Sequence, residues 1–174
     1  MMDHTNNPVT PAGYKMEDLP LHIFFLSGLQ DIYWAENHLA EAMPEIMQAA
    51  TSQELKNAIS FHLDQTQVHA KRLEEAFEIL KEKAKETKCK AMAGILKEVA
   101  NFVDETKEGS AVRDAALILG IRKVNHYEMA TYAGLLAFSH LMGHKEVSAL
   151  LESTLREEEK TNATLTDLAD GGIN

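Results

Sequence analysis

The sequence predicts an all-α protein, and three observations support this prediction. Apolar residues recur in steps of three and four along most of the chain, the spacing that places them on one face of a helix. Glycine and proline are scarce, at 9 and 4 of 174 residues. No stretch alternates apolar and polar residues between turn signals, as the strands of a sheet would. We therefore expect four long helices and a shorter fifth one.

The composition restricts the class of function. With 45% apolar and 25% charged residues, the chain is typical of one globular domain with a buried core. A net charge of −10 without any basic run argues against binding to nucleic acid or to an anionic membrane surface. A single cysteine excludes an internal disulfide framework and fits a reducing compartment. We find no apolar run long enough for a membrane span and no signal peptide, so we expect a cytoplasmic protein.

The first residues of the chain show no helical periodicity. Residues 1–16 place prolines and a glycine among polar residues, so we expect a flexible arm there and a single domain over residues 17–170. The first helix is expected over residues 17–50, with Pro20 in its opening turn, where proline is tolerated. One carboxylate, Glu36, interrupts the apolar line of this helix.

A second long helix is expected over residues 52–84. Residues 51–54, Thr-Ser-Gln-Glu, have the pattern of a capping box, which marks a helix start. Arg72 is assigned to the solvated face of this helix. Four polar residues lie on its apolar line or one turn from it: His62, Gln65, Thr66 and His69.

A shorter helix follows the charged segment 81–88, with an uninterrupted apolar line that begins at Cys89. About twenty helical residues span about 30 Å, enough to return the chain from one end of a bundle to the other. We therefore expect a crossover helix between the second and third long helices. Ser110 is a suitable N-cap for the third long helix, over residues 110–142, and Gly143 is a suitable stop.

The last two long helices also carry polar residues on their apolar lines. The line of residues 110–142 admits Asn125 and Glu128, one helical turn apart, and the line of residues 145–170 admits Glu158. A lone buried carboxylate costs several kcal/mol or takes up a proton. Each of these side chains therefore needs a partner.

Tight turns are expected to bring the polar residues to one depth. Glu128 and Glu158 are each 15 residues from the turn near Gly143, and Glu36 and Thr66 are placed equally about the first turn. Carboxylates and imidazole in the core of a helical bundle are typical of a metal site, and mixed oxygen and nitrogen ligands suit iron or manganese. Bundle helices with one long crossover also have the ferritin-like topology. We expect a ferritin-like four-helix bundle with a fifth, shorter crossover helix.

Seven short motifs occur in one order along the chain: DIYWAE at 31–36, HLDQT at 62–66, RLE at 72–74, CKAM at 89–92, RDAA at 113–116, HYE at 126–128 and LREE at 155–158. In this combination, over residues 20–169, the chain closely resembles the bacterial YciF/YciE family of ferritin-like proteins. The resemblance implies a rubrerythrin-like bundle, usually a homodimer, with a two-metal carboxylate site. It also implies a link to bacterial stress responses, without an established biochemical activity.

The resemblance carries over to the candidate ligands with two departures. The family commonly has glutamate where this chain has Gln65 and Asn125, so a site with five carboxylates would keep three. The loss of two negative charges favours one ion, or none, over a pair, and the two amides become weak ligands or donors that orient the carboxylates. His69 ranks behind His62, from which it is two turns away. The candidate metal ligands are Glu36, His62, Gln65, His69, Asn125, Glu128 and Glu158.

Two functions from different classes are open at this point. The first is a cytoplasmic stress-response protein that binds iron or manganese in the bundle core, with oxygen or peroxide chemistry if the metal is redox-active iron. The second is a metal-free structural or protein-interaction module with a degenerate metal site, in which the buried acids are protonated or hydrogen-bonded. The sequence identifies no catalytic residue.

Overall fold

The computed structural model describes residues 20–171, which form five α-helices and, within that range, no strand. The helices are α1 (Pro20–Ala49), α2 (Gln53–Ile79), α3 (Lys90–Glu105), α4 (Ala111–Leu141) and α5 (Lys145–Gly171). The all-α prediction is therefore confirmed. The expected arm, residues 1–16, lies outside the described residues. Among the described helices, none is both long and apolar enough to span a bilayer.

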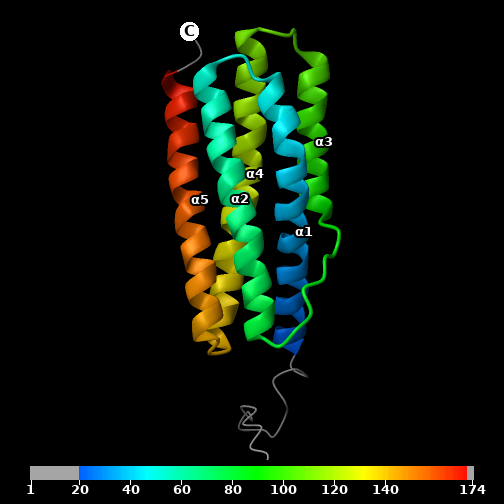
Figure 1. The fold of residues 1–174 in the computed structure, drawn as a ribbon, viewed down its shortest axis with the longest axis vertical. Helices are drawn as coiled ribbons and strands as arrows, with labels where there is room; N and C mark the ends of the chain where they lie inside the picture. Colours follow the sequence, from blue (N-terminus) through cyan, green and yellow to red (C-terminus); the bar gives the residue numbers. More distant parts are fainter. Residues whose placement is uncertain (1–19, 172–174) are drawn as a thin grey trace, which may run out of the picture.

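Four helices pack in a closed order, in which α1 contacts α2, α2 contacts α5, α5 contacts α4 and α4 contacts α1. The colours in Figure 1 show that each helix runs opposite to the next one in this order. The shorter α3 packs outside, against α1 and α4. Residues 80–89 return the chain beside α1, where the amide of Thr87 donates to the carbonyl of Gln30 at 3.1 Å. The expected crossover helix is present, with 16 residues.

The boundaries of α2 differ from the prediction at both ends. The helix ends at Ile79 rather than at residue 84, because Leu80 caps it and Lys81 adopts a left-handed φ of 60°. At the other end Ser52 is the N-cap and accepts from the amide of Leu55 at 3.3 Å. Glu54 therefore does not lie at the third helical position, which a capping box requires, and the predicted capping box is wrong.

A carboxylate from another helix completes the start of α2. Asp114, in the first turn of α4, accepts from the amides of Thr51 and Ser52 at 2.6 and 2.7 Å. Burial acts to raise the pKa of the Asp114 carboxyl, but these hydrogen bonds lower it below its ordinary value. The ionised carboxylate thus ties the N-terminus of α2 to the N-terminus of α4.

The two ends of α4 agree with the prediction. Ser110 is the N-cap and accepts from the amide of Arg113 at 3.2 Å. At the other end Gly143 has a φ of 76°, a left-handed conformation that glycine adopts without a Cβ penalty. The observed bounds of α4, Ala111–Leu141, therefore agree with the predicted range of residues 110–142.

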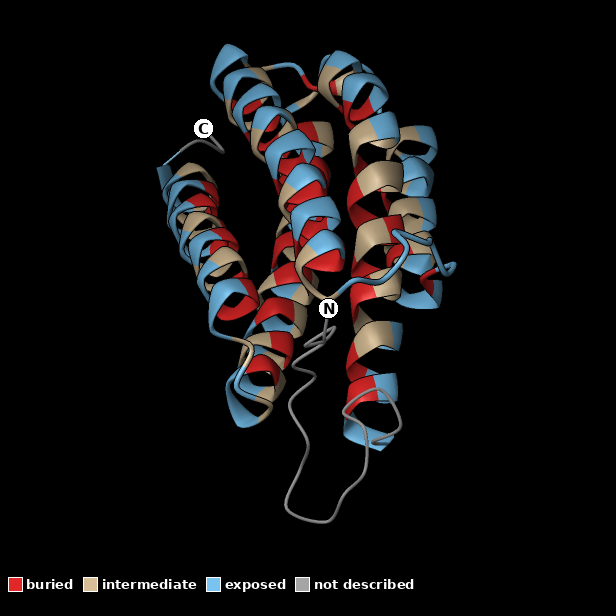
Figure 2. Ribbon diagram, turned by 60° about the horizontal axis from the view of Figure 1, so that its bottom comes forward, coloured by how far each residue is buried: buried red, intermediate tan, exposed pale blue. Residues whose placement is uncertain are grey.

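Figure 2 shows that the buried residues of the five helices face inward. Toward the end of α4, Tyr132 and Ser139 are fully buried, whereas Phe138 and Met142, which continue the spacing of three and four from Leu135, are only half-buried. Ser139 can be buried because its hydroxyl is hydrogen-bonded to that of Ser148 at 2.8 Å. Near the middle of the helices, eight polar residues are at most 1% exposed: Glu36, His62, Thr66, His69, Asn125, Glu128, Thr154 and Glu158.

Candidate metal centre

The structure brings together six of the seven predicted ligands at mid-height in the bundle. They come from all four packed helices: Glu36 from α1, His62 and His69 from α2, Asn125 and Glu128 from α4, and Glu158 from α5. Gln65 is the exception. It is half-buried, and its carboxamide oxygen accepts from the hydroxyl of Thr161 at 2.8 Å, on the boundary between α2 and α5.

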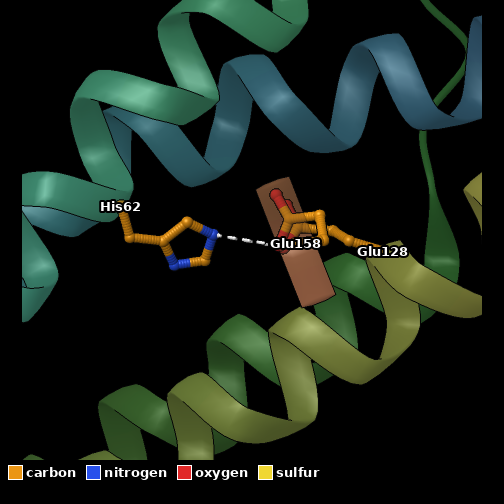
Figure 3. A group of neighbouring side chains, drawn as sticks. All are labelled: His62, Glu128 and Glu158. Atoms are coloured by element: carbon orange, nitrogen blue, oxygen red, sulfur yellow. Dashed lines mark ion pairs between the residues drawn. The ribbon is translucent and has the colours of Figure 1, made fainter. Parts of the chain in front are cut away.

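The first half of the centre contains His62, Glu128 and Glu158 (Figure 3). The Nε2 atom of His62 lies 3.4 Å from Oε2 of Glu128 and 3.6 Å from Oε2 of Glu158. One potential ligand atom from each residue lies within 4.8 Å of the other two. Ligands about 2.0–2.2 Å from one ion lie about 3–4 Å from one another, so this spacing suits a shared cation.

The second half of the centre contains His69, Glu36 and the other oxygen of Glu158. The Nδ1 atom of His69 lies 3.1 Å from Oε1 of Glu158 and 3.6 Å from Oε1 of Glu36. Glu158 therefore directs one oxygen toward each histidine. A carboxylate in this position can bridge two cations or hold one on either side.

Two residues outside the centre orient His69. Its Nε2 atom is 2.9 Å from Oε2 of Glu157, and Arg72 donates two hydrogen bonds to the Glu157 carboxylate, at 2.6 and 2.8 Å. The hydrogen bonds from Arg72 lower the pKa of Glu157 most, so its carboxylate is ionised and can only accept. Nε2 of His69 must therefore carry the proton, and Nδ1 faces the centre. The assignment of Arg72 to a purely solvated face is wrong.

Two uncharged groups orient the buried carboxylates. Asn125 donates from Nδ2 to Oε2 of Glu158 at 2.6 Å and to the backbone carbonyl of the same residue at 3.0 Å. The hydroxyl of Tyr132 donates to Oε1 of Glu36 at 2.5 Å. Asn125 therefore acts as the donor expected for an amide at this position, and it fixes the shared carboxylate.

Several buried ligand atoms in the centre have no hydrogen-bond partner among the described residues. They are both carboxylate oxygens of Glu128, one oxygen each of Glu36 and Glu158, both ring nitrogens of His62 and Nδ1 of His69. Nearly all buried polar atoms in proteins are paired, and unpaired ones usually face an ion or water that completes them. Carboxylate oxygens and imidazole nitrogens that face one another in this way fit the donor set of a divalent transition-metal ion.

Burial and mutual charge set the protonation of the five ionisable groups. Burial raises the pKa of Glu128 well above its ordinary value, and the carboxylates of Glu158 and Glu36 raise it further. Burial also raises the pKa of Glu36. Burial acts to lower the pKa of both histidines, but the neighbouring carboxylates raise that of His62 to about 10 and that of His69 to about 11. Burial alone would raise the pKa of Glu158, but the two imidazoliums lower it to about 2.

Residues 20–174 match the family described as "Domain of unknown function (DUF892)". The chain belongs to this family. Protein YciF of Escherichia coli (strain K12) is 38% identical to it over 160 residues, which are 91% of this chain and 93% of that protein. The resemblance stated from the sequence motifs is therefore confirmed.

Solved structures of other proteins have a similar fold. The crystal structure of the E. coli stress protein YciF has a TM-score of 0.84 and 35% identity, over 88% of this chain and 97% of that one. YcfI of Rhodopseudomonas palustris, described as a candidate structural protein, has a TM-score of 0.82 and 32% identity, over 88% and 98% of the two chains. A protein of Xanthomonas campestris pv. campestris, at 20% identity and a TM-score of 0.69 over 85% and 90%, supports the fold alone.

Three residues that orient the side chains of the centre were not identified from the sequence. Tyr132 lies four residues after Glu128 on the same helical face, a spacing that could have indicated it. Arg72 lies three residues after His69, one helical turn away, and Glu157 precedes Glu158 in the LREE motif. None of these three interrupts an apolar line with a buried charge, which is the signal that identified the ligands.

Proposed function

We propose that this protein is a ferritin-like metal-binding protein of the YciF stress type, with a divalent cation held at mid-height in the bundle. The closed order of α1, α2, α5 and α4 with α3 outside agrees with a ferritin-like four-helix bundle and its crossover. The observation that carries the proposal is the set of unpaired buried oxygens and nitrogens that face one another from four helices. A cation among them would complete the unpaired carboxylate oxygens, Nε2 of His62 and Nδ1 of His69.

The first cation position in this proposal is held by His62, Glu128 and Glu158, whose ligand atoms are the most closely grouped. The second position is held by Glu36, His69 and Glu158, so that Glu158 bridges the pair. Mixed carboxylate and imidazole ligands suit iron or manganese. Bound iron would supply redox chemistry toward oxygen or peroxide. The protein would contribute ligands that are at most 1% exposed, which keeps bulk water from the metal.

A second candidate function is a metal-free structural protein. Its support is that protonated His62 and His69, with pKa values of about 10 and 11, can neutralise the ionised Glu158 without any metal. Glu36, whose pKa burial raises, would then stay protonated, and Glu128 would share a proton with His62. The description of the R. palustris relative as a candidate structural protein agrees with this alternative.

Metal loading distinguishes the two functions. Protein purified without chelator and loaded with Mn(II), or anaerobically with Fe(II), should retain one or two ions per chain after desalting. The Glu128→Gln variant should lose an ion and lose the thermal stabilisation that added metal gives. In a metal-free protein, trace metal would be found, and Glu128→Gln would leave stability unchanged or raise it because a buried acid is removed. The homodimer implied by the family resemblance is part of the proposal and is tested by light scattering.

A further inference from the structure

A groove of about 670 Å³ opens on the surface between α2 and α5. Its lining includes Asp64, Gln65 and Val68 on α2 and Glu157 and Lys160 on α5, together with Arg72. The side chains of Arg72 and Glu157 are 23% and 29% exposed. The groove therefore reaches the two residues that orient His69.

One imidazole ring separates the groove from the candidate metal centre. Oε2 of Glu157, on the groove, is 2.9 Å from Nε2 of His69. Nδ1 of the same ring is 3.1 Å from Oε1 of Glu158, in the centre. The contacts lead from a solvated carboxylate, through one fully buried ring, to the carboxylate shared by both cation positions.

Polar side-chain contacts close the boundary between α2 and α5 on both sides of His69. Thr161 donates to Gln65, one turn before His69, and Arg72 pairs with Glu157, one turn after it. Such contacts can separate without exposing an apolar core. A cation that arrives at Glu157 also replaces the positive charge of Arg72, so the carboxylate keeps a partner as the pair opens.

At two other helix boundaries the helices approach each other closely at a glycine. A Cβ atom on Gly28 of α1 would meet Leu135 of α4 at 2.7 Å, and one on Gly120 of α4 would meet Val99 of α3 at 2.6 Å. At these two points apolar side chains fill the space between the helices, so an ion has no room to pass there. Opening either boundary would separate apolar side chains, whereas the α2–α5 boundary is closed at this height by hydrogen bonds and one ion pair.

We propose that the α2–α5 groove is the route by which a divalent cation enters and leaves the centre. Glu157 receives the cation, and displacement of the His69 side chain admits it to Glu158. This proposal rests on the proposed function, because a route needs a centre to serve. Asp64 and Glu157 offset the positive charges of Arg72 and Lys160 in the lining, and Asp64 gives an arriving cation a first carboxylate.

Stopped-flow uptake of Co(II), followed by its visible absorption, tests the route with two matched pairs of variants. Asp64→Lys reverses a charge in the groove. Asp104→Lys makes the same change at an exposed position of α3, away from the groove. Val68→Trp narrows the groove, and Val112→Trp makes the same change at another exposed position. All four positions are exposed, so the variants are expected to fold.

Asp64→Lys should slow uptake about tenfold at low salt, whereas Asp104→Lys should stay within about twofold of wild type. Val68→Trp should slow uptake and release by the same factor, without a change in the dissociation constant, and Val112→Trp should change neither rate. If both groove variants load as fast as their matched controls, the route is wrong, although the centre stands. If wild-type protein binds no Co(II), the proposed function is wrong and the route falls with it.

Discussion

The two histidines of the centre differ in what lies behind them. Both are buried on α2, and each faces one oxygen of Glu158. The outer nitrogen of His69 is bonded to Glu157, which Arg72 holds with two hydrogen bonds. Neither nitrogen of His62 has a hydrogen-bond partner among the described residues. His69 is therefore an oriented ring, and His62 is held by packing and charge alone.

The two histidines show that burial of a ring and orientation of a ring are separate properties, although the sequence pattern reports only the first. Position on an apolar line shows that both histidines are buried, and the sequence ranks His62 ahead only because His69 lies two turns away from it. Orientation depends on an outer partner, and by that criterion His69 ranks ahead, because metal-bound histidines usually donate their other N–H to a carboxylate or carbonyl. We expect the His69 half of the centre to be preorganised and the His62 half to be completed by the cation.

The largest effect is expected from the residue that both halves share. Glu158→Gln should reduce bound metal to traces, because each cation position loses a ligand. It should also destabilise the metal-free protein by about 3–5 kcal/mol, because two imidazoliums lose their common counterion. Urea unfolding in EDTA and metal analysis measure the two effects. The matched control is Glu159→Gln, at an exposed neighbouring position, which should change neither.

The next largest effect is on metal binding and distinguishes the His62 side of the centre from the His69 side. Glu128→Gln should remove the cation on the His62 side, whereas Glu157→Gln should weaken the cation on the His69 side about 10–100-fold and leave the other in place. Mn(II) titration by calorimetry gives the number of sites and their affinities. Equal loss of all metal in both variants would show one shared ion instead of two positions.

A smaller effect is expected from pH. Rising pH should lower the stability of the metal-free fold and increase the stabilisation that bound metal gives. In the metal-free fold His62 and His69 keep protons up to pH values of about 10 and 11, and Glu128 also has a raised pKa. The unfolded chain releases these protons earlier, so stability falls as the pH rises above about 5. Glu158, with a pKa of about 2, loses its contribution only below its ordinary value of 4.5.

We therefore expect the melting temperature in EDTA to be at least about 4 °C lower at pH 9 than at pH 5.5. Metal binding must displace the same protons, so Mn(II) should stabilise the fold more as the pH rises. Calorimetric melts at both pH values measure this, with Glu128→Gln as the variant in which the slope in EDTA becomes shallower. An EDTA melting temperature that rises toward pH 9 would contradict the assigned protonation.

The smallest effect is expected at Tyr132. Tyr132→Phe removes the 2.5 Å hydrogen bond to Glu36 and leaves that carboxylate without its donor. A loss of about 1–3 kcal/mol is expected in urea unfolding, with metal retained on the His62 side. Tyr33→Phe is the control, because the hydroxyl of Tyr33 bonds to Glu74 at an exposed site. Equal losses in the two variants would mean that Glu36 does not depend on Tyr132.

Features that depend on one helix could be predicted from the sequence, whereas contacts between helices could not. Periodicity revealed the five helices, because a helix must bury one face, and it revealed Glu36, Glu128 and Glu158 as buried charges on those faces. The partner of a side chain across an interface follows no periodicity. Asp114 at the start of α2 and the Arg72–Glu157 pair behind His69 could therefore be found only when the helices were packed.

Gln65 shows the same limit from the other side. Its position one turn from His62 suggested a ligand. In the structure its side chain lies at the boundary between α2 and α5, hydrogen-bonded to Thr161. Spacing along one helix shows which side a residue lies on, but residues three apart still differ by about 60° around the helix axis. The assignment of Gln65 to the centre or to its edge depends on that difference.

Anomalous diffraction from crystals of the Mn(II)- or Fe(II)-loaded protein, recorded at the metal absorption edge, tests the central claim most directly. We expect an anomalous peak enclosed by His62, Glu128 and Glu158, with a second peak, where two ions bind, between Glu36 and His69. Loaded crystals with no anomalous peak among these side chains would show that protons, and not a metal, balance the buried acids.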